Sequence, residues 1–219
     1  MEERDGGRPL GQHRLIAVAG SSSGAGKSTV SAALAERLGA RLLTEDDLLG
    51  DGLFGAFDCA LGDNADAVEP LLDAARALVG VVAASSQRWV TDALLPGAFW
   101  LAGRYDRERV TAAAARLAEV LAPTAPLLVY LAGDAEALFA RAVAQRGAAW
   151  PDRVVGWTGR WPLPYYPGPP VIDVPSLVRL YAWLDAETRA VLAAWPLPTV
   201  VLDARQPVDA LVARVLETG

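Results

Sequence analysis

The sequence has few of the side chains on which several common chemistries depend. Its 219 residues contain one cysteine, Cys59, and one histidine, His13. Structural zinc sites take four Cys or His ligands, so this composition argues against one, and an intrachain disulfide cannot form. Serine-histidine and cysteine-histidine catalysis would both have to use His13. We expect that residue to lie in a flexible N-terminal arm, residues 1–13, and therefore expect neither chemistry.

The chain also lacks an excess of basic residues and a long apolar stretch. It carries 20 Lys and Arg against 26 Asp and Glu, a formal net charge of −6, which argues against a nucleic-acid partner. Apolar runs such as residues 78–84 are far shorter than the roughly 18 residues of a membrane-spanning helix. The first 14 residues mix both charges and do not resemble a signal peptide. We expect a cytoplasmic protein without a membrane partner.

Hydrophobic residues make up 53% of the chain and follow an alternating pattern of strands and helices. This order predicts an α/β fold with a five-stranded parallel sheet and helices on both faces, formed by residues 14–219 as one domain. Residues 46–64 are predicted to be a loop. The predicted strands cover 14–20, 41–45, 88–91, 127–131 and 198–203, and the predicted helices cover 30–39, 65–80, 106–122, 134–146, 176–194 and 207–217.

A Gly/Ser-rich loop between the first strand and its helix is the strongest chemical signal. Glycines allow the backbone to approach phosphate oxygens, and successive N–H groups at a helix N-terminus bind anions. Lys27 would neutralise the β- and γ-phosphates, and the Ser28 hydroxyl would bind Mg²⁺. The loop departs from the strict G-x-x-x-x-G-K-[ST] pattern at Ser21. The nucleotide-binding residues that it predicts are Ser23, Gly24, Ala25, Gly26, Lys27, Ser28 and Thr29.

The run VAGSSSGAGKSTVSAALAERL resembles the first motif of the P-loop small-molecule kinases, a group that includes uridine kinases, nucleoside monophosphate kinases and chloramphenicol phosphotransferases. The order of elements is similar over residues 14–217. The resemblance implies a P-loop NTPase fold of the nucleoside-monophosphate-kinase type. It also implies ATP and Mg²⁺ as cofactors.

Carboxylates follow the second and third predicted strands, where ligands of a parallel sheet gather. Glu45, Asp46 and Asp47 follow the second strand and Asp92 follows the third. Similarity to the Q-D-S-F-Y pattern of uridine kinases places Asp46 in the proton-accepting position, with Asp47 as the close competitor. Asp92 resembles the acidic residue that acts on Mg²⁺ together with Ser28. The alternative is that these residues only cap helices or turn loops.

The predicted acceptor region is acidic. No Lys or Arg lies between Arg41 and Arg76, an interval that contains nine Asp and Glu residues. Like charges at close range repel, so this interval disfavours an acceptor that already carries a phosphate. A solvated acidic loop without a ligand is the alternative. The candidate acceptor-binding residues are Asp47, Asp58, Phe54, Phe57, Arg88 and Arg104, of which the two phenylalanines either stack on a planar acceptor or pack beneath the loop.

Residues 147–170 hold six prolines together with Trp, Tyr and Arg, and this composition predicts an irregular lid. Lids of related kinases close arginines over the phosphates and exclude water. Arg141 and Arg146-Gly147, which are spaced R-x-x-x-x-R-G, resemble the R-x-x-x-R-G run of uridine kinases with one extra residue. This resemblance makes Arg146 and Arg141 the predicted catalytic arginines. The aromatic residues of the lid form either a wall over the acceptor or a homodimer contact.

Taken together, the sequence predicts an ATP-dependent kinase that phosphorylates a hydroxyl of a neutral or cationic small molecule, such as a nucleoside or an antibiotic. Asp46, Lys27, Arg146 and Arg141 would be catalytic, and Ser28 and Asp92 would bind Mg²⁺. The first alternative is a nucleoside monophosphate kinase. The second, from another class, is a nucleotide-binding regulatory ATPase that lacks an acceptor pocket.

Overall fold

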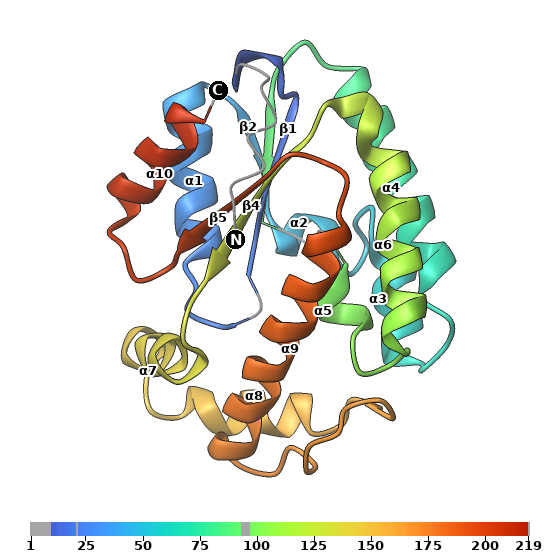
Figure 1. Cartoon of the computed structure of the whole chain (residues 1–219), viewed down its shortest axis with the longest axis vertical. Coiled ribbons are helices and arrows are strands. Elements are labelled where there is room, and N and C mark those ends of the chain that lie inside the picture. Colours follow the sequence, from blue (N-terminus) through green and yellow to red (C-terminus); the bar gives the residue numbers. More distant parts are fainter. Residues whose placement is uncertain (1–9, 21, 93–96, 219) are drawn as a thin grey trace.

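A parallel five-stranded sheet forms the centre of the molecule (Figure 1). The computed structural model describes residues 10–20, 22–92 and 97–218. The strand order is β2 (Arg41–Leu43), β3 (Trp89–Thr91), β1 (Leu15–Ala19), β4 (Leu127–Ala132) and β5 (Thr199–Asp203), with every neighbouring pair parallel. The predicted α/β class and five-stranded parallel sheet are therefore confirmed.

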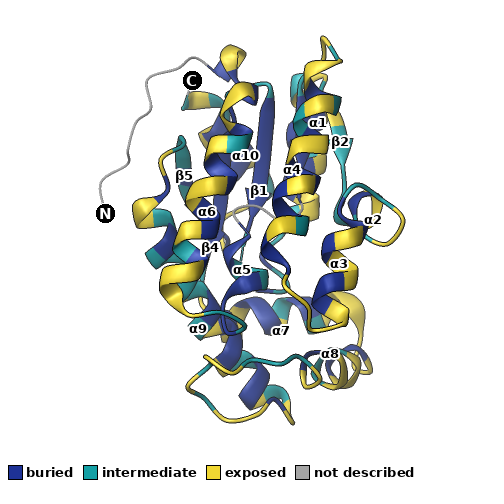
Figure 2. Ribbon diagram, turned by 90° about the vertical axis from the view of Figure 1, so that its right-hand side faces the viewer, coloured by how far each residue is buried: buried dark blue, intermediate teal, exposed yellow. Residues whose placement is uncertain are grey.

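Helices cover both faces of this sheet because its central strands are apolar throughout. All residues of β1 and β4 are buried, as expected for parallel strands packed on two sides. Helices α3 (Gly55–Gly62), α4 (Val68–Ala83) and α6 (Arg107–Leu121) pack on one face, and α1 (Lys27–Leu38) and α10 (Val208–Glu217) pack on the other. Figure 2 shows that these helices carry both buried and exposed residues, and the buried apolar ones belong to the two hydrophobic clusters that include the strands.

Three helices lie beyond the carboxyl ends of the strands, at the bottom of Figure 1: α7 (Ala135–Arg146), α8 (Trp150–Thr158) and the first half of α9 (Val174–Ala194). Their apolar residues form a third hydrophobic cluster, which is separate from those on the two faces of the sheet. A cavity lies where this layer meets the strand ends.

The predicted irregular segment 147–170 is wrong over its first part, which forms helix α8. Pro151 falls in the first turn of that helix, where a missing N–H is tolerated. The predicted loop 46–64 also contains α3, and the short helix α2 (Glu45–Leu48) begins before it. The remaining short elements are α5 (Ala98–Leu101) and the 3₁₀ turns η1 (Leu10–Gln12) and η2 (Ala122–Thr124).

His13 does not belong to a loose arm. It is 4% exposed, and its Nδ1 lies 2.8 Å from the carbonyl oxygen of Ala125. Residues 10–13 are therefore part of the packed structure, whereas residues 1–9 of the predicted arm lie outside the described residues. Within the described ranges, no helix combines the length and apolar character that crossing a membrane requires.

Candidate active site

The loop between β1 and α1 has the backbone geometry of an anion-binding site. Gly24 and Gly26 adopt positive φ angles of 82° and 88°, and Gly26 is the N-cap of α1. A Cβ atom on Gly24 would lie 2.1 Å from the carbonyl oxygen of Leu138, so no other residue fits there. Because Gly26 has no side chain to cap the helix, the first N–H groups of α1 are left for a ligand or water. Ser21 lies outside the described residues.

A cavity of about 340 Å³ opens beside this loop, at the carboxyl ends of the strands. One side is the phosphate loop itself, and the other is formed by residues of α5, α8 and α9. Its described lining is Ala19, Gly20, Ser22, Ser23, Gly24, Ala25, Gly26, Lys27, Ser28, Thr29, Glu45, Asp92, Gly97, Phe99, Trp100, Tyr130, Gln145, Arg146, Trp150, Val154, Trp157, Tyr181 and Thr188. All seven predicted nucleotide-binding residues therefore lie on its wall.

Two carboxylates, Glu45 and Asp92, meet in this cavity. Asp92 follows β3 and is 3% exposed, and its Oδ1 accepts a hydrogen bond of 2.8 Å from the backbone N–H of Glu45. Asp92 thus fixes the start of α2 and with it the position of Glu45. Burial raises the pKa of the Glu45 carboxyl above its ordinary value, and the Lys27 ammonium opposes this by favouring the charged form.

Glu45 is the site residue that the sequence interpretation missed in favour of its neighbours. Asp46 and Asp47 are exposed and line no part of the cavity. The Asp47 carboxylate instead accepts hydrogen bonds from the Thr44 N–H (2.9 Å) and hydroxyl (2.7 Å), and these bonds lower its pKa. The placement predicted for Asp46 and Asp47 is therefore corrected. The sequence did carry a signal for this role of Asp47: Thr44 and Asp47 have the spacing of a capping box at the start of a helix.

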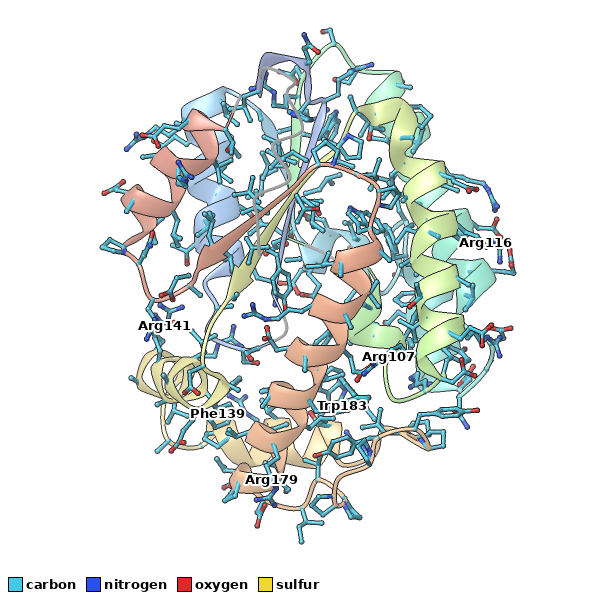
Figure 3. The ribbon with its side chains drawn as sticks, in the orientation of Figure 1. Arg107, Arg116, Phe139, Arg141, Arg179 and Trp183 are labelled. Carbon is cyan, nitrogen blue, oxygen red and sulfur yellow. The ribbon has the colours of Figure 1, made fainter. Side chains whose placement is uncertain are left out.

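The two predicted catalytic arginines occupy different places. Arg146 lines the cavity, with its guanidinium 5.0 Å from the centre of the Trp150 ring. Arg141 lies outside the lining. Its Nε and Nη1 donate to the carbonyl oxygens of Gly24 (2.7 Å) and Ala204 (2.8 Å), between α7 and the end of β5 (Figure 3). Arg141 therefore hydrogen-bonds the phosphate loop from outside the cavity. The predicted contact of Arg141 with phosphate is corrected to this supporting role.

The predicted acceptor-binding residues lie outside the cavity. Phe54 and Phe57 are 1% and 0% exposed and pack edge to face in the core, so the stacking interpretation is corrected. Arg88 precedes β3, and its Nε donates to the His13 carbonyl oxygen (2.9 Å) at the opposite end of the sheet.

Arg104 and Asp58 also lie apart from the lining. The Nη2 of Arg104 donates to the Leu61 carbonyl oxygen (2.5 Å), and burial lowers the pKa of this guanidinium. Asp58 is exposed on α3, from where its charge contributes to the raised pKa of Glu45. The acidic interval found in the sequence therefore delivers one carboxylate, Glu45, into the cavity itself.

The cavity is lined by aromatic residues and not by the predicted acceptor-binding residues. Phe99 and Trp100 come from α5, and Trp150 and Trp157 come from one face of α8. The Trp100 and Trp157 rings lie 6.3 Å apart, centre to centre, in an edge-to-face arrangement. Helix α8 therefore presents apolar side chains to the cavity.

The donor set fits a nucleoside triphosphate with Mg²⁺. Lys27, the helix N–H groups and Arg146 are suited to phosphate oxygens, and the Ser28 hydroxyl and the Asp92 carboxylate are oxygen ligands of the kind that Mg²⁺ takes. Among the residues described, no group of three or more His, Cys, Asp or Glu side chains is arranged to enclose a metal. Mg²⁺ is usually bound by one or two carboxylates together with substrate phosphates and water, so this is the expected arrangement.

The phosphate loop, the 2-3-1-4-5 strand order and the cavity at the strand ends define a P-loop nucleotide-binding fold. No family model matches the chain, and no curated protein does. Solved structures do match. A deoxyadenosine kinase from M. mycoides with bound dATP has a TM-score of 0.56 at 15% identity, with 93% of this chain and 97% of that chain covered.

Two further kinases show the same likeness. A shikimate kinase from Bacteroides thetaiotaomicron has a TM-score of 0.54 at 16% identity, covering 93% of this chain and 96% of that one. A gluconokinase from Sinorhizobium meliloti has a TM-score of 0.51 at 18% identity, covering 96% and 93%. The chain thus has the fold of the P-loop small-molecule kinases.

Proposed function

We propose that the protein is an ATP-dependent kinase that transfers a phosphoryl group to a hydroxyl of a neutral or cationic small molecule. The observation that carries this proposal is the composition of one cavity. Its walls bring together a phosphate loop with Lys27 and Ser28, two carboxylates, Glu45 and Asp92, and an aromatic surface. The kinase neighbours in structure support the same class of reaction.

Each residue has a role that follows from its chemistry. Bound Mg·ATP supplies the transferable γ-phosphoryl group. Lys27 and Arg146 neutralise the phosphate oxygens, and Ser28 and Asp92 are the residues that would hold the Mg²⁺. Glu45 accepts the proton of the acceptor hydroxyl at its carboxylate, because it is the carboxylate that reaches the cavity without sitting at the Mg²⁺ position.

The charge of the lining favours an acceptor without a phosphate of its own. Lys27 and Arg146 are the basic residues among the described lining, and both are assigned to ATP. A monophosphate would therefore meet Glu45, Asp92 and aromatic rings without a cation to pair it. The lining of the cavity, rather than the acidic interval between Arg41 and Arg76, therefore favours an acceptor without a phosphate.

The test is the release of ADP from Mg·ATP with pooled acceptors: nucleosides, nucleoside monophosphates, and hydroxylated neutral or cationic antibiotics. Stimulation by an unphosphorylated pool supports the proposal and allows the acceptor to be found by subdivision. Stimulation by monophosphates alone would favour a nucleoside monophosphate kinase. Slow turnover that no pool accelerates would favour a regulatory ATPase.

A further inference from the structure

Thr188 carries a buried hydroxyl on the wall of the cavity. The residue lies in the second half of α9, is 1% exposed and lines the cavity. Its Oγ1 has no hydrogen-bond partner among the residues that the structure describes. A threonine inside a helix ordinarily donates its hydroxyl to the carbonyl oxygen three or four residues earlier. Thr188 does not, so a polar group is buried here at the cost of its hydration.

The hydroxyls around Thr188 already have partners. Tyr130 donates to Asp185 Oδ1 (2.7 Å), and Asp185 in turn accepts from Arg189 (2.6 Å). The hydroxyl of Tyr181 lies 3.3 Å from that of Ser23 in the phosphate loop. These bonds hold both tyrosine rings in place against the cavity. Thr188 is thus an unpartnered hydroxyl in a wall of fixed side chains.

Flat aromatic surfaces also line this cavity. Phe99 lies 6.4 Å from Tyr181 and 5.1 Å from Trp100, measured between ring centres, and all three line the cavity. Aromatic faces bind planar rings by stacking and dispersion, and they provide no counter-charge for an anion. Arg146 and Lys27, the cations of the described lining, belong to the phosphate side.

We propose that Thr188 is a specificity-determining residue, whose hydroxyl hydrogen-bonds the edge of a planar, uncharged ring carried by the acceptor. The ring lies against Phe99, Trp100 and Tyr181, and its hydroxyl-bearing arm points toward Glu45. This inference rests on the proposed kinase function and deepens it, since it names the chemical class of the acceptor and the residue that reads it.

The test compares Thr188→Val, which removes the hydroxyl at nearly constant shape, with Thr188→Ser, which keeps it. The probes are deoxyadenosine, deoxycytidine and thymidine as planar uncharged rings, with shikimate and gluconate as non-planar anions. Binding without ATP is measured by calorimetry, and transfer is measured by kcat and KM. Ser31→Ala is the matched control, because Ser31 also has a buried, unpartnered hydroxyl but lies on α1 outside the lining.

We expect at least one planar probe to bind and both anions to fail. Thr188→Val should weaken binding of that probe on the order of tenfold and raise its KM, while kcat and the Kd for ATP stay unchanged. Thr188→Ser and Ser31→Ala should match the parent protein. The melting temperature of Thr188→Val should not fall, because an unsatisfied polar atom has been removed. If Thr188 were only structural, Thr188→Val would lower the melting temperature and leave probe binding and KM unchanged.

The inference and the proposed function fail in different ways. If a planar probe binds through Thr188 but is never phosphorylated, the role of Thr188 in ring binding is supported and the proposed kinase function is contradicted. Phosphorylation that is unaffected in Thr188→Val, preference for shikimate or gluconate, or failure of every planar probe to bind overturns the inference.

Discussion

Arg141 and Gly24 are joined by a hydrogen bond of 2.7 Å from the arginine Nε to the glycine carbonyl oxygen. The same guanidinium reaches Ala204, directly after β5, so one side chain ties the phosphate loop to a strand two positions away in the sheet. Gly24 has a positive φ within the phosphate loop, and its carbonyl oxygen is the acceptor of this bond. The fold therefore supports the conformation of its phosphate loop from outside the cavity.

Arg141→Ala should loosen this loop. Hydrogen bonds from a charged donor are worth about 1.5–3 kcal/mol each, so we expect a lower melting temperature and an ATP Kd raised on the order of tenfold. Calorimetry and thermal unfolding measure the two effects. Arg37→Ala, which removes an exposed ion pair with Asp209, should change neither. Normal ATP affinity in Arg141→Ala would contradict the supporting role.

Lys27→Ala should abolish phosphoryl transfer. The ammonium lies on the cavity wall beside the helix N-terminus, where loss of one charged donor typically costs a factor on the order of 10² or more in rate. Transfer of ³²P from labelled ATP measures the effect, and far-ultraviolet circular dichroism checks the fold. Full activity in this variant would refute the phosphate-loop assignment.

Glu45→Gln should cut transfer by a factor on the order of 10² or more while ATP still binds, because the amide cannot accept the acceptor proton. Asp46→Asn is the matched control, since this neighbouring carboxylate is exposed and outside the cavity. It should remain within about twofold of the parent. If Asp46→Asn lost transfer and Glu45→Gln kept it, Asp46 would be the proton acceptor instead.

The raised pKa of Glu45 predicts opposite pH effects on activity and stability. Transfer requires the carboxylate, so the rate should fall as the pH falls through a pKa above the ordinary value of 4.5. Burial favours the protonated form in the folded state, so the contribution of this residue to stability is lost as the pH rises through that pKa. Glu45→Gln should therefore raise the melting temperature at pH 7. A variant less stable than the parent would contradict this account.

Phe57→Ala should damage the fold and leave specificity alone. The ring is fully buried against Phe54, and truncation of a core phenylalanine costs about 3–5 kcal/mol of unfolding free energy. Urea unfolding measures the loss, and KM for the acceptor should be unchanged in the folded fraction. A specific rise in acceptor KM with normal stability would restore the stacking interpretation.

The sequence predicted the sheet well because buried parallel strands read as continuous apolar runs, as in the LIAVA of β1. It predicted the phosphate loop because glycine spacing is a local property. The acceptor residues were a different matter. Arg88 precedes β3 and so lies at the end of the sheet opposite the cavity. Phe57 is buried in the core where α3 packs. Both positions depend on the tertiary structure, which local sequence patterns do not show. Glu45, which lines the cavity, was passed over because the motif alignment favoured its neighbour Asp46.

Helix α8 shows the same limit in another form. Six prolines in residues 147–170 suggested an irregular lid, but five of them follow α8 and the sixth, Pro151, falls in its first turn. Proline count alone could not separate the helix from the segment after it. The aromatic wall of the cavity depends on that helix, since Trp150, Val154 and Trp157 lie on one of its faces.

Lys27 is the only lysine in the chain, and the other basic residues are all arginines. Apart from the N-terminal amine, a reagent that modifies primary amines therefore has a single target, and that target lies in the phosphate loop. Bound ATP should shield it, so the extent of labelling becomes a direct measure of nucleotide occupancy. The proposed role of Lys27 predicts that immobilisation or fluorescent tagging through lysine inactivates the protein. Acetylation of Lys27 would remove the positive charge of that side chain from the phosphate loop.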